Sequence, residues 1–151
     1  MSDVVCGLSE TPLDVPAALA RVRRDAAGAI ASFVGTVRST GAAPDVTDVV
    51  ALEYEAHPLL AEERLASAAR EAAHRWGLLA VEVVHRTGRC ELGDPTVVVV
   101  CSAPHRRAAL EACSWLIDEI KTTVPIWKKE ITARGESWVG TNLTHPGAPP
   151  A

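Results

Sequence analysis

The chain has 151 residues, a length that suits one folded domain with a sizeable core. Its composition is 48% hydrophobic but only 4% aromatic, which predicts a core of Val, Leu, Ile and Ala and excludes a disordered chain. The net charge of −4 and the pI of about 5.7 argue against a general nucleic-acid binder, because such proteins have a basic face and a high pI.

Residues that typically begin or end helices and turns, together with the spacing of apolar residues, predict a mixture of helices and strands. Asp14 with Pro16 is typical of a helix start, Gly77 of a helix stop, and Pro125 ends a second long helix. Gly35 inside a strand pattern indicates a bulge or a close approach. The expected elements are a short helix from 14 to about 24, strands at 28–38 and 49–56 around a mobile loop, a helix at 58–76, strands at 78–86 and 96–103 joined by a turn, a helix at 105–121, and short strands at 126–132 and 137–139.

This order favours one α+β domain over a doubly wound sheet. No internal repeat or second domain is evident, so we expect a single catalytic domain over residues 1–140. The Pro- and Gly-rich end, 141–151, is expected to be a disordered tail.

The four cysteines form no C-x-x-C pair, and the longest apolar run, Val97–Cys101, is too short to span a bilayer. The first residues lack a signal-peptide pattern, so we expect a cytoplasmic protein with free thiols. Cys101 and Cys113 lie in apolar runs and are expected in the core. Cys90 lies in the predicted turn and is the one candidate for a reactive thiol.

Several familiar sites are absent from the sequence. It has no phosphate-binding loop, no dinucleotide fingerprint, no H-E-x-x-H pair and no nucleophile elbow. The five histidines lack the spacing of metal ligands. We therefore expect neither a dedicated metal site nor a cofactor.

The lysines are the most informative feature. The chain has 15 basic residues, but its only lysines are Lys121, Lys128 and Lys129, all within nine residues. Lysine can lose its proton in a protein whereas arginine cannot, so this cluster suggests a site that uses lysine chemistry. The alternative is a solvated basic edge beside neighbouring acidic residues.

Two further positions suggest anion binding. His105, Arg106 and Arg107 stand at the start of the second long helix, where free backbone N–H groups and the helix dipole favour an anion. Arg38 ends a strand beside the flexible loop. Both features also occur as ordinary solvated surface. His85 alternates with Val81 and Val83 and is interpreted as a satisfied core histidine, whereas Trp127 either fills the core or forms the floor of a pocket.

Five segments together resemble the catalytic (large) subunit family of molybdopterin synthase. They are SFVGTVR (32–38), LEYEAHPLLA (52–61), HRTGRCELGD (85–94), VVVVCSAPHRRAALEA (97–112) and IKTTVPIWKKE (120–130). They occur in the family's order, and the PIWKKE stretch after a helix that ends in lysine is the most specific of them.

The resemblance implies an α/β-hammerhead-type fold with a mixed or antiparallel sheet and two long helices. It also implies a homodimer at the core of a heterotetramer, with a small ubiquitin-like sulfur carrier whose C-terminal Gly-Gly ends in a thiocarboxylate. The reaction would insert sulfur into cyclic pyranopterin monophosphate (precursor Z) to form the molybdopterin dithiolene. The resemblance makes Lys121 and Lys128 catalytic, and we expect Lys121 to act as the acid and base and Lys128 to stabilise charge. It assigns to substrate binding Thr36, Val37, Arg38, His105, Arg106, Lys129 and Glu130.

Helix length adds one constraint to this assignment. His105 and Lys121 flank one predicted helix, and 16 residues at 1.5 Å each separate their backbones by roughly 24 Å. A small pterin cannot easily touch both ends, so we expect each site to be shared by two subunits. The rival reading is a non-enzymatic adaptor for a ubiquitin-like protein or an anionic ligand, and a metal-free pterin or nucleotide hydrolase is a weaker one.

Overall fold

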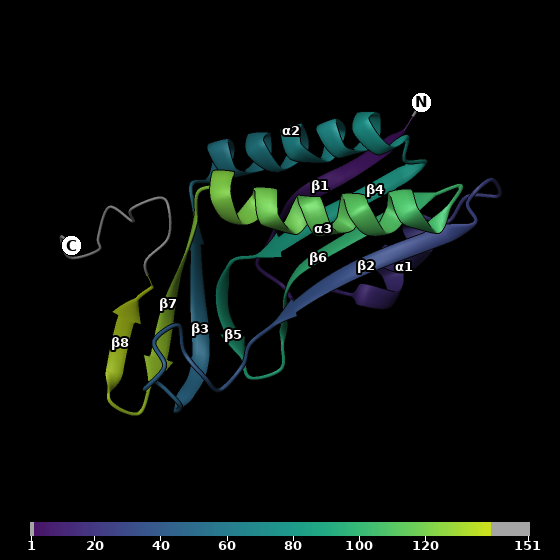
Figure 1. Cartoon of the computed structure of the whole chain (residues 1–151). Helices are drawn as coiled ribbons and strands as arrows, with labels where there is room; N and C mark the ends of the chain where they lie inside the picture. The colour runs from purple at the N-terminus through teal and green to yellow at the C-terminus, as the bar shows by residue number, and fades with distance from the viewer. Residues whose placement is uncertain (1, 140–151) are drawn as a thin grey trace.

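A computed structural model describes residues 2–139 as two four-stranded sheets and three helices (Figure 1). The first sheet has the strand order β1 (Asp3–Ser9), β4 (Ala80–Arg86), β6 (Pro95–Ala103), β2 (Ala29–Thr36). β1 runs parallel to β4, and the other neighbours are antiparallel. This is a mixed sheet that joins strands from both halves of the chain.

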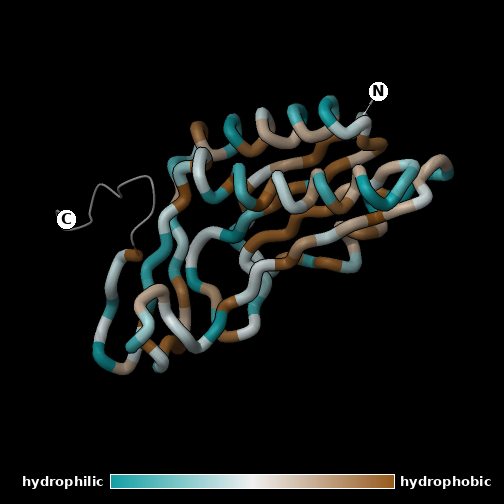
Figure 2. The backbone as a smooth tube through the Cα atoms, in the orientation of Figure 1, coloured by the Kyte–Doolittle hydropathy of each residue, from teal (hydrophilic) through white to brown (hydrophobic). Residues whose placement is uncertain are grey.

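The central strands of the first sheet are buried on both faces. Helices α2 (Pro58–Trp76) and α3 (Arg106–Thr123) lie side by side over one face, and the short helix α1 (Val15–Arg21) lies on the other (Figure 1). Because side chains alternate along β6, Val99 faces the long helices while Val98 and Val100 face α1. The brown strands between the helices in Figure 2 show this continuous apolar layer.

The second sheet is antiparallel and extends from the end of the first, away from the helices. Its order is β5 (Gly88–Glu91), β3 (Val49–Ala56), β7 (Ile126–Thr132), β8 (Gly135–Trp138). Val49, Leu52 and Cys90 of this sheet form a small separate core together with Val37. The two sheets meet where α3 ends and β7 begins.

The helix ends follow the expected chemistry. The Asp14 carboxylate accepts a hydrogen bond from the Ala17 backbone N–H at 3.0 Å, and Gly77 ends α2 in the left-handed conformation with φ of 60°. His57 caps α2 with Nδ1, which accepts from the Leu60 N–H at 3.2 Å. Val124 leaves α3 in an extended conformation ahead of Pro125.

The predicted α+β class and the two long helices are confirmed. The structure differs from the expectation in dividing the strands between two sheets, in ending α1 at Arg21, and in having β1 and β5. β5 lies inside the segment that we interpreted as a turn. It begins at Gly88 and is followed by Gly93, and both glycines have positive φ. The expected tail, 141–151, lies outside the described residues.

The proposed reactivity of Cys90 is wrong. Cys90 lies in β5, fully buried, and burial raises the pKa of its thiol, which disfavours the reactive thiolate. Cys101 and Cys113 are buried in the main core, as expected. Across residues 2–139, no helix combines the length and apolarity needed to cross a membrane.

Candidate active site

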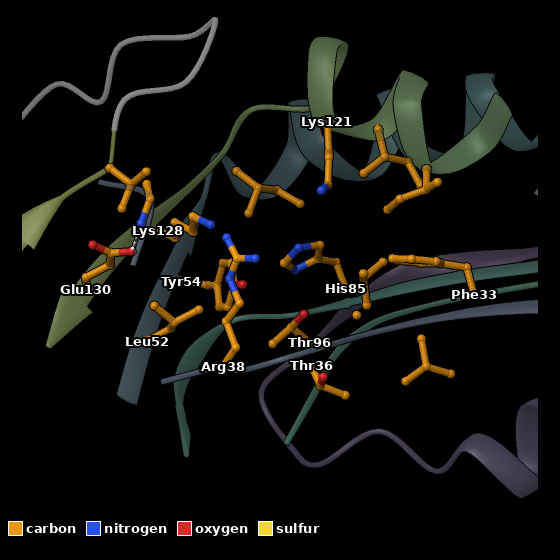
Figure 3. A pocket seen from close by; sticks show the side chains of 18 of the residues that line it. Phe33, Thr36, Arg38, Leu52, Tyr54, His85, Thr96, Lys121, Lys128 and Glu130 are labelled. Atoms are coloured by element: carbon orange, nitrogen blue, oxygen red, sulfur yellow. Dashed lines mark hydrogen bonds between the residues drawn. The ribbon is translucent and has the colours of Figure 1, made fainter. Parts of the chain in front are cut away.

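A cavity of about 660 Å³ opens where the two sheets meet beneath the C-terminal end of α3. Its walls come from β2, the loop after it, β3, the end of β4, the start of β6, the last turns of α3, β7 and Val139 after β8 (Figure 3). Segments from both sheets and from α3 therefore contribute to one concave site.

Three cationic side chains point into this cavity: Arg38, Lys121 and Lys128 (Figure 3). Lys121 shares one face of α3 with Ile117 and Ile120, which also line the cavity, because residues three and four apart on a helix lie on the same side. These groups give the cavity a strong preference for an anionic ligand.

Lys128 is the cation whose chemistry the surroundings change most clearly. Burial lowers the pKa of its ammonium below the ordinary lysine value, and the nearby positive charges of Lys121 and Arg38 lower it further, whereas Glu130 opposes the shift. A lysine with a lowered pKa holds a larger neutral fraction near pH 7, so Lys128 is suited to proton transfer.

The Glu130 side chain holds the loop that closes one side of the cavity. The Ala42 backbone N–H donates to its Oε2 at 2.8 Å, and the Gly41 N–H donates to the Val46 carbonyl at 2.7 Å. A Cβ at Gly41 would lie 2.7 Å from Glu130 Oε1 and 2.6 Å from Val46 Cγ1. Only glycine therefore fits between the loop and this buried carboxylate.

Gly35 lies near the end of β2, where the chain leaves the first sheet and reaches the cavity. The β2–β6 pairing shifts register between Gly35 and Thr36, and a Cβ on Gly35 would lie 2.8 Å from Val97 Cγ1. The predicted bulge and close approach are confirmed. The shift sends the following residues out of the first sheet, so that Arg38 turns into the cavity.

His85, Tyr54 and Thr96 form a polar cluster on the cavity wall (Figure 3). His85 Nδ1 lies 2.7 Å from the Arg86 carbonyl oxygen, and the His85 ring meets the Tyr54 ring edge-on at 4.9 Å. Burial lowers the pKa of His85 to about 4 and raises the pKa of Tyr54, an effect that the hydrogen bond to Thr96 partly offsets. Both side chains are therefore neutral at pH 7.

The cavity includes five of the residues that the resemblance points to, namely Thr36, Arg38, Lys121, Lys128 and Glu130. Two others lie elsewhere. Val37 is buried in the small core of the second sheet, and Lys129, next to Lys128 on β7, points to the opposite face. There its ammonium pairs with Glu53 at 3.2 Å and Glu136 at 3.1 Å.

His105 and Arg106 lie at a separate shallow hollow at the other end of α3, with Arg107 and Leu110. His105 occupies the N-cap position but makes no capping hydrogen bond through its side chain. The helix between this hollow and Lys121 is unbroken from Arg106 to Thr123. Within one chain the two groups of predicted site residues are therefore not brought together.

The site also holds residues that the sequence did not identify as functional. The sequence favoured a core role for His85, because it alternates with core valines, and Tyr54 and Thr96 carried no signal beyond membership of strands. Among residues 2–139, no group of three His, Cys, Asp or Glu side chains is placed to hold a metal ion.

Comparison with known proteins gives consistent matches. The family model described as "MoaE protein" matches residues 8–123. A molybdopterin synthase catalytic subunit of Bacillus subtilis is 39% identical over 136 residues, which are 90% of this chain and 85% of the relative. The structure of molybdopterin synthase from Staphylococcus aureus has a TM-score of 0.81 at 34% identity, over 89% of this chain and 96% of the other.

One further structure shares the fold. It is the Helicobacter pylori complex of subunits 1 and 2 of the molybdopterin-converting factor, with a TM-score of 0.72 and coverage of 89% of both chains. At 22% identity this match supports the architecture alone.

Proposed function

This chain belongs to the MoaE protein family of molybdopterin synthase catalytic subunits, and from its cavity we propose that it transfers sulfur from a thiocarboxylated ubiquitin-like carrier to precursor Z. The observation that carries the proposal is the convergence of Arg38, Lys121 and Lys128 on one cavity. Both reactants are anions, a phosphate ester and a thiocarboxylate, and three cations suit them. We expect the reaction to be cytoplasmic.

The chemistry requires proton transfer as well as charge. When the carrier's sulfur attacks a carbon of the pterin side chain, the oxygen that leaves this carbon must be protonated. The lowered pKa of Lys128 supports giving it this acid and base role, with Lys121 and Arg38 holding negative charge. The sequence alone had suggested Lys121 for proton transfer and Lys128 for charge stabilisation.

As its partner we propose the small ubiquitin-like sulfur carrier that membership of this family implies. Its Gly-Gly end suits a narrow approach, because residues without side chains let a backbone pass close to protein walls. We place His105 and Arg106 of a second copy of the chain at each cavity, since one unbroken helix separates them from Lys121 within the same copy. A homodimer with two carriers gives a heterotetramer with two equivalent sites.

Reconstitution tests the proposal. The chain is mixed with a thiocarboxylated carrier and precursor Z, and formation of the dithiolene product is measured. Lys128→Ala should abolish product. Lys129→Gln is the matched control, since Lys129 neighbours Lys128 but faces away from the cavity, and it should retain activity within a few-fold. Carrier binding without any product from the wild-type chain would favour an adaptor instead.

A further inference from the structure

Sulfur transfer from a thiocarboxylate needs a second chemical step. Once the carrier's sulfur has bonded to the substrate carbon, the carrier's acyl group and the substrate share that sulfur as a thioester. The sulfur stays with the substrate only when the acyl carbon–sulfur bond breaks, and water is the available nucleophile. A group that accepts a proton from this water would speed the step.

His85 has the geometry of such a group. A carbonyl oxygen can only accept a hydrogen bond, so the 2.7 Å contact with the Arg86 carbonyl places the ring proton on Nδ1. The lone pair is then on Nε2, at the far side of the ring. The hydrogen bond and the edge-on Tyr54 ring hold the imidazole in one orientation.

Nε2 is free and accessible. No hydrogen bond within residues 2–139 occupies it, although the residue is 92% buried. The one fully enclosed side-chain nitrogen or oxygen without a partner in this part of the chain belongs to Arg86. Nε2 of His85 is therefore open to the cavity, which the same ring lines (Figure 3).

Burial keeps the ring neutral at pH 7. Arg38, Lys121 and Lys128 face the same space. The nearest carboxylate on the cavity wall, Glu130, is turned to the loop and accepts from Ala42. A neutral imidazole can take up a proton, whereas an ammonium or guanidinium group cannot.

We propose that His85 is a catalytic residue of the proposed sulfur transfer, accepting through Nε2 a proton from the water that cleaves the carrier–substrate thioester. The water oxygen bonds to the acyl carbon as its proton passes to Nε2. The acyl carbon–sulfur bond breaks, its electron pair stays on sulfur, and the imidazolium returns the proton to that sulfur. The carrier leaves as a carboxylic acid, which ionises, and the substrate keeps a thiol.

The test separates the two ring nitrogens. In His85→Asn the amide nitrogen stands where Nδ1 was, so it can still donate to the Arg86 carbonyl, but nothing replaces Nε2. In a single turnover with thiocarboxylated carrier and precursor Z, this variant should release product on the order of 10²–10⁴-fold more slowly. Mass spectrometry should show the covalent carrier–substrate adduct accumulating, and hydroxylamine, which cleaves thioesters without a general base, should restore release of the sulfurated substrate.

His85→Gln provides a second variant if the first does not fold, because its amide reaches the Nε2 position but cannot accept a proton. A wild-type rate in either folded variant overturns the proposal, as does loss of product without adduct, since His85 would then act before thioester cleavage or only on the fold. The inference rests on the proposed function. If the proposed function itself is wrong, the wild-type chain will form neither adduct nor product, which is a different result from the two above.

Discussion

Acidification should destabilise this protein by about 3 kcal/mol through His85 alone. Its pKa is about 4 in the folded chain and about 6.5 when exposed, since burial penalises the charged ring. The unfolded chain therefore binds the proton more readily, so stability from this group is fully present above pH 6.5 and is lost as the pH falls toward 4. The 2.5-unit difference, at about 1.4 kcal/mol per unit, limits the loss to about 3.5 kcal/mol, of which about 3 kcal/mol is reached by pH 4.

Urea unfolding of the wild-type chain and of His85→Asn at pH 7.5 and pH 4 measures this contribution. Carboxylates and the other histidines titrate in both proteins, so their effects cancel when the two pH-dependent changes are subtracted. The wild-type free energy of unfolding should fall by about 3 kcal/mol more than that of the variant. Equal losses would show that the ring is hydrated or charged in the folded protein, and the neutral His85 would be refuted.

Three other outcomes follow from the site. Lys128→Arg should lose product formation, because guanidinium keeps the charge but cannot transfer a proton, whereas Lys121→Arg keeps the positive charge proposed for Lys121 and should lose less activity. Normal turnover in Lys128→Arg would remove the acid and base role from Lys128. Inactive Arg106→Ala and Lys121→Ala chains, mixed in equal amounts, should recover about a quarter of wild-type activity. Half of the dimers would then be heterodimers, and each heterodimer would have one intact shared site. No recovery despite subunit exchange would place the whole site in one chain. Gly41→Ala should lower the free energy of unfolding, measured by urea titration, by about 1–3 kcal/mol, because the added methyl group would be overpacked against Glu130 and Val46. An unchanged free energy of unfolding would mean that the loop moves to accommodate the methyl group.

The sequence predicted the long helices well because their signals are local. The periodic apolar face of α2 and its Gly77 stop lie within one continuous segment, and the same is true of α3 and Pro125. β1 carried no comparable signal. Its partner β4 begins at Ala80, more than seventy residues away, so only tertiary structure identifies it as a strand.

The candidate site divides in the same way. Lys121 and Lys128 were identified because lysine is rare in this chain, and Lys129 was included with them by proximity. Alternation along β7 then separates Lys128 from Lys129, which only a known strand register reveals. The role of His85 could not be predicted from the sequence, where it stands in a pattern of alternating valines. Only the structure shows the hydrogen bond from Nδ1 that leaves the lone pair on Nε2.

The pairing of the first sheet also sets an order of folding during synthesis. β1 pairs with β4, and β2 pairs with β6, so neither of the first two strands has its partner until residues 80–103 have left the ribosome. Contacts between distant segments form slowly, and unpaired strand edges are prone to aggregation in the meantime. We therefore expect the N-terminal third of the nascent chain, with β1 and β2 still unpaired, to be the part most prone to aggregation before the sheet forms.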